Sequence, residues 1–68
     1  MNLVKRSFSL AGHRTSVALE PEFWDALTDI ATARTATLST LVADLDRDRL
    51  PDQPLASRLR IFALKHRP

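Results

Sequence analysis

The stretch that organises this chain is HRTSVALEPEFWDAL, residues 13–27. Its first seven residues alternate between two faces, and this period of two predicts a short β-strand. One face holds Arg14, Ser16 and Ala18, and the other holds Thr15, Val17 and Leu19. Glu20-Pro21-Glu22 then places a proline at a first helical position with acidic neighbours, which predicts the start of a helix.

Amphipathic helices follow the strand. After Pro21, apolar residues recur at the spacing of one helical face: Phe23, Ala26, Leu27, Ile30 and Ala31. Trp24 lies beside this face, and we expect it to cap the edge of the core. Thr37 is a good N-cap for a second helix, whose apolar face is Leu38, Leu41, Val42 and Leu45. Two prolines in residues 50–54 interrupt the helical pattern, and residues 55–66 predict a third, shorter helix.

The pattern divides the chain into three parts. Residues 1–12 form a basic arm or an extra strand, residues 13–48 form the central unit, and residues 49–68 form a proline-containing loop and the C-terminal helix. Residues 3–10 alternate only loosely, and Ala11-Gly12 supplies a break after them. The sequence leaves two alternatives for this first part. It can fold back on residues 13–19 as a hairpin, or it can remain a separate arm.

The size of the chain favours association with a second copy. Without disulfides, a bound metal or a partner chain, a domain of 68 residues stabilises itself by only roughly 3–5 kcal/mol. Cysteine is absent and the two histidines, His13 and His66, are far apart, which excludes disulfides and gives no metal-ligand spacing. We therefore expect a homodimer, in which two copies together enclose a core that one strand and two helices cannot.

Other function classes are disfavoured by composition. The single glycine excludes a glycine-rich phosphate loop, and no apolar run reaches the roughly 18 residues of a membrane span. No apolar block follows the first charges as in a signal peptide, so a soluble, cytoplasmic protein is expected. Asp44, Asp46 and Asp48 lack the glycine and the terminal glutamate of a calcium loop. No nucleophile lies beside a base, and neither an enzyme nor a cofactor is predicted.

The net charge of +2 is unevenly distributed. Residues 1–19 carry three basic residues and no acidic one. Residues 20–48 carry seven carboxylates against two arginines, and residues 49–68 carry five basic residues against one aspartate. This asymmetry indicates an anionic partner at one or both ends of the chain.

Residues 13–27 resemble the strand and first helix of ribbon-helix-helix proteins, the class of the Arc and MetJ repressors. The shared pattern is a basic residue, hydroxyl residues alternating with Val, then Leu, an acidic turn and a helix. Thr37-Leu38-Ser39-Thr40-Leu41-Val42 resembles the start of the second helix in that family, so the resemblance covers about residues 13–46. Val4-Lys5-Arg6-Ser7-Phe8-Ser9 and the C-terminal helix resemble the flanking segments of a short bacterial subset. Thr35 stands where the family often has glycine.

The resemblance implies a mainly α fold with one short β-strand. It further implies an intertwined homodimer with a two-stranded intermolecular antiparallel ribbon, to which this chain appends a C-terminal helix. The expected function is sequence-specific DNA binding in transcription regulation, as a repressor, with the ribbon in the major groove. The dimer core would comprise Val17, Leu19, Phe23, Leu27, Ile30, Leu38, Leu41, Val42 and Leu45.

The resemblance also assigns contacts with double-stranded DNA. The outward strand residues Arg14, Ser16 and Ala18 would contact bases; Ala18 can touch only a thymine methyl group. The start of the second helix, at Thr37, Leu38 and Ser39, would bind phosphate through free backbone N–H groups. Further phosphate contacts are expected from Lys5, Arg6 and His13.

An alternative function remains open. The same dimer can be a protein-interaction module, antitoxin-like or an adaptor, that contacts a partner protein through the C-terminal helix. The acidic middle of the chain and the small Ala18 favour this alternative. Ionic strength separates the two, because phosphate binding weakens steeply as salt rises.

Overall fold

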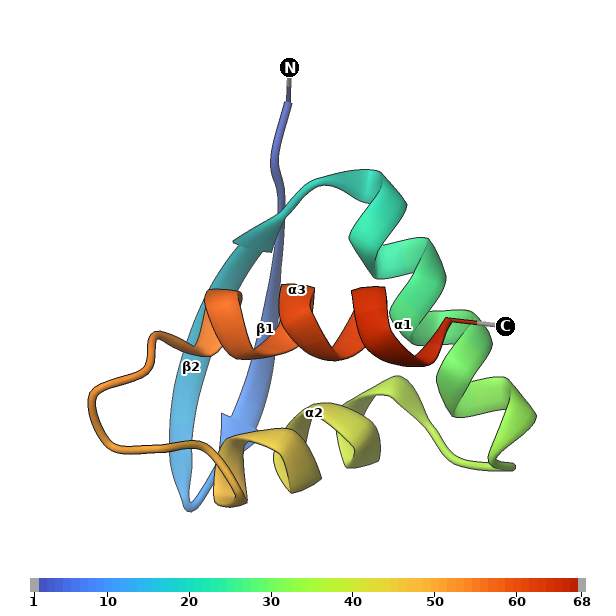
Figure 1. The fold of residues 1–68 in the computed structure, drawn as a ribbon. Helices are drawn as coiled ribbons and strands as arrows, with labels where there is room; N and C mark the ends of the chain where they lie inside the picture. Colours follow the sequence, from blue (N-terminus) through green and yellow to red (C-terminus); the bar gives the residue numbers. More distant parts are fainter. Residues whose placement is uncertain (1, 68) are drawn as a thin grey trace.

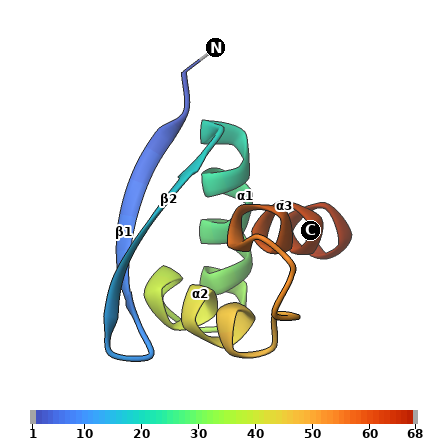
Figure 2. The ribbon, with the colours of Figure 1, turned by 90° about the vertical axis from the view of Figure 1, so that its left-hand side faces the viewer.

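A β-hairpin and three helices make up the protein in a computed structural model that describes residues 2–67. The strands are β1 (Val4–Leu10) and β2 (His13–Leu19), and the helices are α1 (Pro21–Ala33), α2 (Leu38–Arg47) and α3 (Leu55–His66). The hairpin forms one layer and the helices form a second layer against one of its faces (Figures 1 and 2). None of the described helices is long and apolar enough to cross a membrane.

The hairpin is closed by a two-residue turn. Ala11 and Gly12 both have positive φ, 51° and 81°, as a type I′ turn requires, and this turn matches the twist of antiparallel strands. The register then pairs Ser7 with Ser16 and Lys5 with Ala18. Of the two arrangements left open for residues 3–10, the hairpin on residues 13–19 is the one that forms. The expectation of a fold with one short strand is wrong, because residues 4–10 form a second strand within the same chain.

Trp24 is fully buried beneath β1. Its side chain is 1% exposed, its Nε1–H donates to the Val4 carbonyl oxygen at 2.7 Å, and its ring lies 5.8 Å from that of Phe8. The expectation that Trp24 caps the edge of the core is wrong, because β1 extends over the indole and encloses it. Helical periodicity alone places Trp24 beside the apolar face and cannot reveal this cover.

One chain closes a core by itself. The residues predicted for a dimer core are buried within the single chain, except Phe23 and Leu38, which stay partly exposed. The hairpin and α3 complete this core with Phe8, Leu10, Leu59, Phe62 and Ala63. The Cα radius of gyration, 11.2 Å, matches the roughly 11 Å of a compact domain of this length. The expectation that a second copy is needed to enclose the core considered one strand and two helices, and β1 and α3 supply the missing cover.

The loop between α2 and α3 is ordered by Arg49. Its Nε–H donates to Asp46 Oδ1 at 3.2 Å and its Nη1–H donates to the Gln53 carbonyl oxygen at 2.6 Å. Helix α3 begins directly after Pro54, as the prolines predict. An ion pair between Arg60 and Glu20, with 2.9 Å between Nη2 and Oε1, joins α3 to the start of α1.

Helix α1 ends in a Schellman motif that needs a left-handed residue. The Thr35 N–H donates to the Thr32 carbonyl oxygen at 3.0 Å, and the Ala36 N–H donates to the Ala31 carbonyl oxygen at 2.9 Å. Thr35 has a φ of +56°, a conformation that a β-branched residue adopts only with strain. The substitution of Thr for the glycine usual in this turn therefore leaves the turn intact at a cost in stability.

We predict that Thr35→Gly stabilises the protein. Relief of about 1–2 kcal/mol of left-handed strain outweighs the roughly 0.4–1 kcal/mol that glycine adds to the entropy of the unfolded chain. A net gain of about 0.5–1 kcal/mol raises Tm by several degrees in a domain of this size. Thr32→Gly, in the last turn of α1, is the matched control and lowers Tm. A Thr35→Gly protein that melts at or below the wild-type Tm contradicts the strain argument.

The Glu20–Arg60 pair predicts a pH dependence. The pKa of Glu20 is lowered by hydrogen bonding to its own backbone and by the Arg60 guanidinium. A carboxyl group with a lower pKa in the folded state stabilises the protein above its unfolded pKa, and this contribution disappears as pH falls through the folded value. Chemical denaturation at pH 6 and pH 3 should thus show wild type more stable than Glu20→Gln at pH 6 and a smaller difference at pH 3. If the difference in the free energy of unfolding between the two proteins stays constant with pH, the ionised Glu20 carboxylate does not stabilise the fold.

Candidate nucleic-acid interface

The face of the hairpin that points away from the helices is polar. In the register of the two strands, three directly opposed pairs share this face, and we call their six residues the outer face: Lys5, Ser7, Ser9, Arg14, Ser16 and Ala18. All are exposed except Ala18, which is half-buried. The alternation of side chains along each strand separates this set from the buried Phe8, Leu10, Val17 and Leu19.

Hydroxyl groups link the two strands across the outer face. The Oγ atoms of Ser7 and Ser16 lie 2.9 Å apart, and Arg14 Nη1–H donates to Ser9 Oγ at 3.4 Å. Each of these bonds joins a predicted contact residue on β2 to a residue on β1. Both partners of each bond are exposed, so the groups stay within reach of a ligand.

The outer face carries positive charge without a carboxylate. Lys5 and Arg14 supply the charge, while Arg6 belongs to the opposite face of β1 and has its guanidinium 5.4 Å from the centroid of the Trp24 ring. His13 is exposed and starts β2 next to the turn, opposite Leu10. The hairpin therefore gathers cations and hydroxyls that the sequence assigned separately to an arm and a strand.

The start of α2 offers a second polar site, in the helical layer. Thr37 caps the helix, with its Oγ1 accepting from the Thr40 N–H at 3.1 Å. Among residues 2–67, no hydrogen-bond acceptor is found for the backbone N–H groups of Leu38 and Ser39. The first turn of α2 contains no acidic residue. These free donors and the positive end of the helix dipole suit a phosphate oxygen.

The aspartates of α2 form ion pairs with arginines. Asp44 is paired with Arg47, and Asp46 is paired with Arg49. In the described part of the chain, no group of three or more metal-ligating side chains comes together. These pairs use the carboxylates to stabilise the end of the helix and its loop.

Ser7 and Ser9 are contact candidates that the sequence did not identify. The sequence pattern that identifies them is the alternation of Lys5, Ser7 and Ser9. This pattern shows which face they occupy only once the register of β1 with β2 is known. Because the strand pairing sets which residues share a face, a loose pattern in residues 3–10 was insufficient by itself.

Comparisons with known proteins agree with this architecture. The family model described as ribbon-helix-helix domain matches residues 3–67. A solved structure of an uncharacterized protein from Bordetella pertussis Tohama I has a TM-score of 0.79 and 30% sequence identity. The match covers 94% of this chain and 54% of that chain, so this chain spans about half the length of that protein. No curated protein sequence matches significantly. The family match over nearly the whole chain shows that this chain belongs to the ribbon-helix-helix family.

Proposed function

We propose that this chain is a sequence-specific DNA-binding transcriptional regulator, acting as a homodimeric repressor. The observation that carries the proposal is the outer face of the hairpin, a two-stranded surface with cations and hydroxyls and no carboxylate. Ribbon-helix-helix domains are typically DNA-binding proteins without enzymatic activity, which agrees with this surface. The proposal does not include a metal or a cofactor.

The chemistry of the outer face suits the edges of bases. Arg14 can donate two hydrogen bonds to guanine O6 and N7, a hydroxyl such as that of Ser16 can bond to several bases, and Ala18 can contact a thymine methyl group. A two-stranded β-ribbon also fits the major groove, which is about 12 Å wide. These three residues of β2 are therefore the proposed base contacts.

Pairing of β2 with its copy in a second chain remains the proposed dimer contact. Among residues 2–67, the edge of β2 that faces away from β1 makes no backbone hydrogen bond. Strands about 4.8 Å apart give a four-stranded sheet of roughly 14 Å between its outermost strands, wider than the groove of about 12 Å. The two β2 strands would enter the groove, and β1 would lie over its walls, where Lys5 and Ser9 meet phosphate.

Phosphate contacts beyond the outer face would set the register of the complex on DNA. The backbone N–H groups of Leu38 and Ser39, beside the Thr37 cap, are the proposed donors. Arg6 and His13 are exposed on the hairpin and complete the proposed set. Such contacts supply affinity that depends on salt and carries no sequence information.

We predict that Arg14→Ala loses DNA affinity and keeps its thermal stability. The readout is fluorescence anisotropy with a labelled duplex selected from a random pool by the wild-type protein, at two salt concentrations. Both copies of the homodimer lose a bidentate base contact, each worth about 1–3 kcal/mol, so binding weakens by at least roughly 30-fold. Arg14 is exposed and its one described side-chain bond is the long one to Ser9, so Tm should not change.

The matched control is Arg47→Ala, which removes one positive charge from an exposed ion pair on α2 and should leave affinity within about twofold. Equal losses of DNA affinity in the two variants would mean that Arg14 contributes only nonspecific positive charge. No binding at low salt by a folded wild-type protein would refute the proposed function and favour the protein-interaction module.

A further inference from the structure

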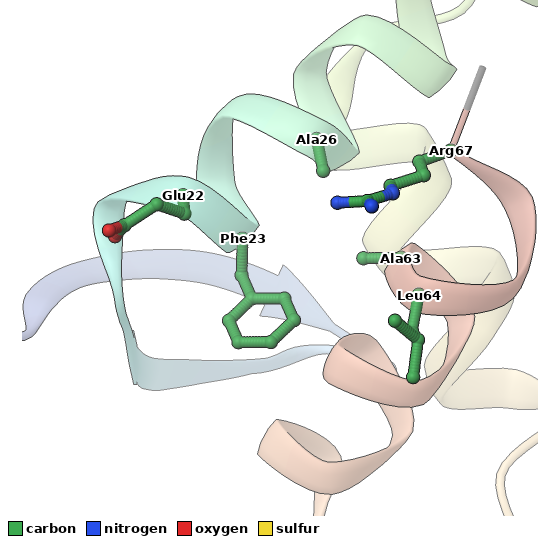
Figure 3. Close-up of a pocket in the computed structure, with 6 residues that line it drawn as sticks. All are labelled: Glu22, Phe23, Ala26, Ala63, Leu64 and Arg67. Atoms are coloured by element: carbon green, nitrogen blue, oxygen red, sulfur yellow. The ribbon is translucent and has the colours of Figure 1, made fainter.

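A groove lies between α1 and α3, and no strand residue lines it. Its cavity has a volume of about 170 Å³ and is lined by Glu22, Phe23, Ala26, Ala63, Leu64 and Arg67. Figure 3 shows the Phe23 ring and the Leu64 side chain on either side of the opening, with the Arg67 side chain reaching across from α3 towards Ala26. The groove is therefore apolar at its base and open to an apolar side chain from outside.

Beside the groove, α3 exposes an apolar ridge. Ile61 and Leu64 are 44% and 68% exposed, and their spacing of three residues puts them on one face of the helix. Lys65 and Arg67 follow at the end of the helix and are exposed as well. We call Ile61 and Leu64 the α3 ridge. The C-terminal end of α3, beside this ridge, is basic.

The opposite side of the groove has an acidic edge on α1. Glu22, Asp25 and Asp29 follow a spacing of three and four residues along one helical face, and all three are exposed. They line a wider, open hollow together with Ala26 and Arg67. Among the described residues, none of the three carboxylates makes an ion pair. This α1 acidic edge therefore has unpaired negative charge next to an apolar groove.

We propose that the α1–α3 face is a self-association surface whose occupant is a second copy of this chain. The ridge supplies apolar side chains for the groove, and the basic end of α3 supplies charge for the acidic edge of α1. Leu64 belongs to both the ridge and the groove, so a twofold rotation near it places each ridge in the other copy's groove. Such an isologous contact closes as a pair instead of growing into a filament.

This surface is separate from the one proposed for DNA. Its residues lie on α1 and α3, whereas the outer face and the free edge of β2 lie on the hairpin (Figure 2). The α1–α3 contact can therefore form while the hairpin stays free to bind DNA. The self-association does not require the DNA-binding proposal to hold, and it is measured without DNA.

The test is sedimentation velocity of charge-reversed variants. One variant carries Asp25→Lys and Asp29→Lys; Glu22 is kept because its charge favours the first turn of α1. The other carries Lys65→Glu and Arg67→Glu. Each variant alone meets like charges at both contacts and should associate at least tenfold more weakly than wild type. An equimolar mixture has opposite charges at both contacts and should regain the wild-type mass.

Leu64→Asp gives an independent test through the apolar contact, with Leu50→Asp as its control. Leu50 is also strongly exposed, at 65%, but lies in the α2–α3 loop. Leu64→Asp should lower the sedimenting mass, whereas Leu50→Asp should leave it unchanged, with circular dichroism verifying the fold of both. Wild type that sediments as the same species as Leu64→Asp, or a mixture that fails to regain mass, overturns the proposal. DNA affinity is measured on the same proteins as a separate test. Its loss or retention decides the proposed function and does not decide the self-association.

Discussion

The cover that β1 places over Trp24 is the contact on which the rest of the structure depends. The indole is the largest fully buried side chain of the chain, and its N–H group is satisfied by the carbonyl oxygen of Val4. An unsatisfied buried donor costs about 1–3 kcal/mol, so the strand supplies both the apolar cover and the polar partner. Without β1, the Trp24 N–H group would lose its acceptor and the indole would lose its contacts with Phe8 and Arg6.

This contact determines what the two faces of the hairpin do. One face packs on the helices through Phe8, Leu10, Val17 and Leu19, and the alternation of the strands leaves the cations and hydroxyls on the other. A ribbon that is already formed within one chain changes the role of a second copy, which is then not needed to close the core. The proposed association then depends on two surfaces, the free edge of β2 and the α1–α3 face.

Much of this fold was predictable from local patterns. The β2 faces, the start of α1 at Pro21, the Thr37 cap and the start of α3 after Pro54 are confirmed. The cover of Trp24 and the alignment of Ser7 with Ser16 were not predictable, because both join segments distant along the chain. Periodicity reveals which face a residue occupies and leaves open which segment lies against that face. Membership of the ribbon-helix-helix family followed from the same local patterns.

Isotope-filtered nuclear Overhauser spectroscopy distinguishes a core closed within one chain from a core shared between two chains. Uniformly ¹³C,¹⁵N-labelled chain is unfolded, mixed with unlabelled chain and refolded, so that contacts between chains are detected separately from contacts within one chain. If one chain closes the core, strong contacts from the Trp24 indole to Val4 and Phe8 appear in the unfiltered spectrum and none of them in the filtered one. Trp24–Phe8 contacts in the filtered spectrum would mean that β1 is exchanged between copies, and would contradict the single-chain core.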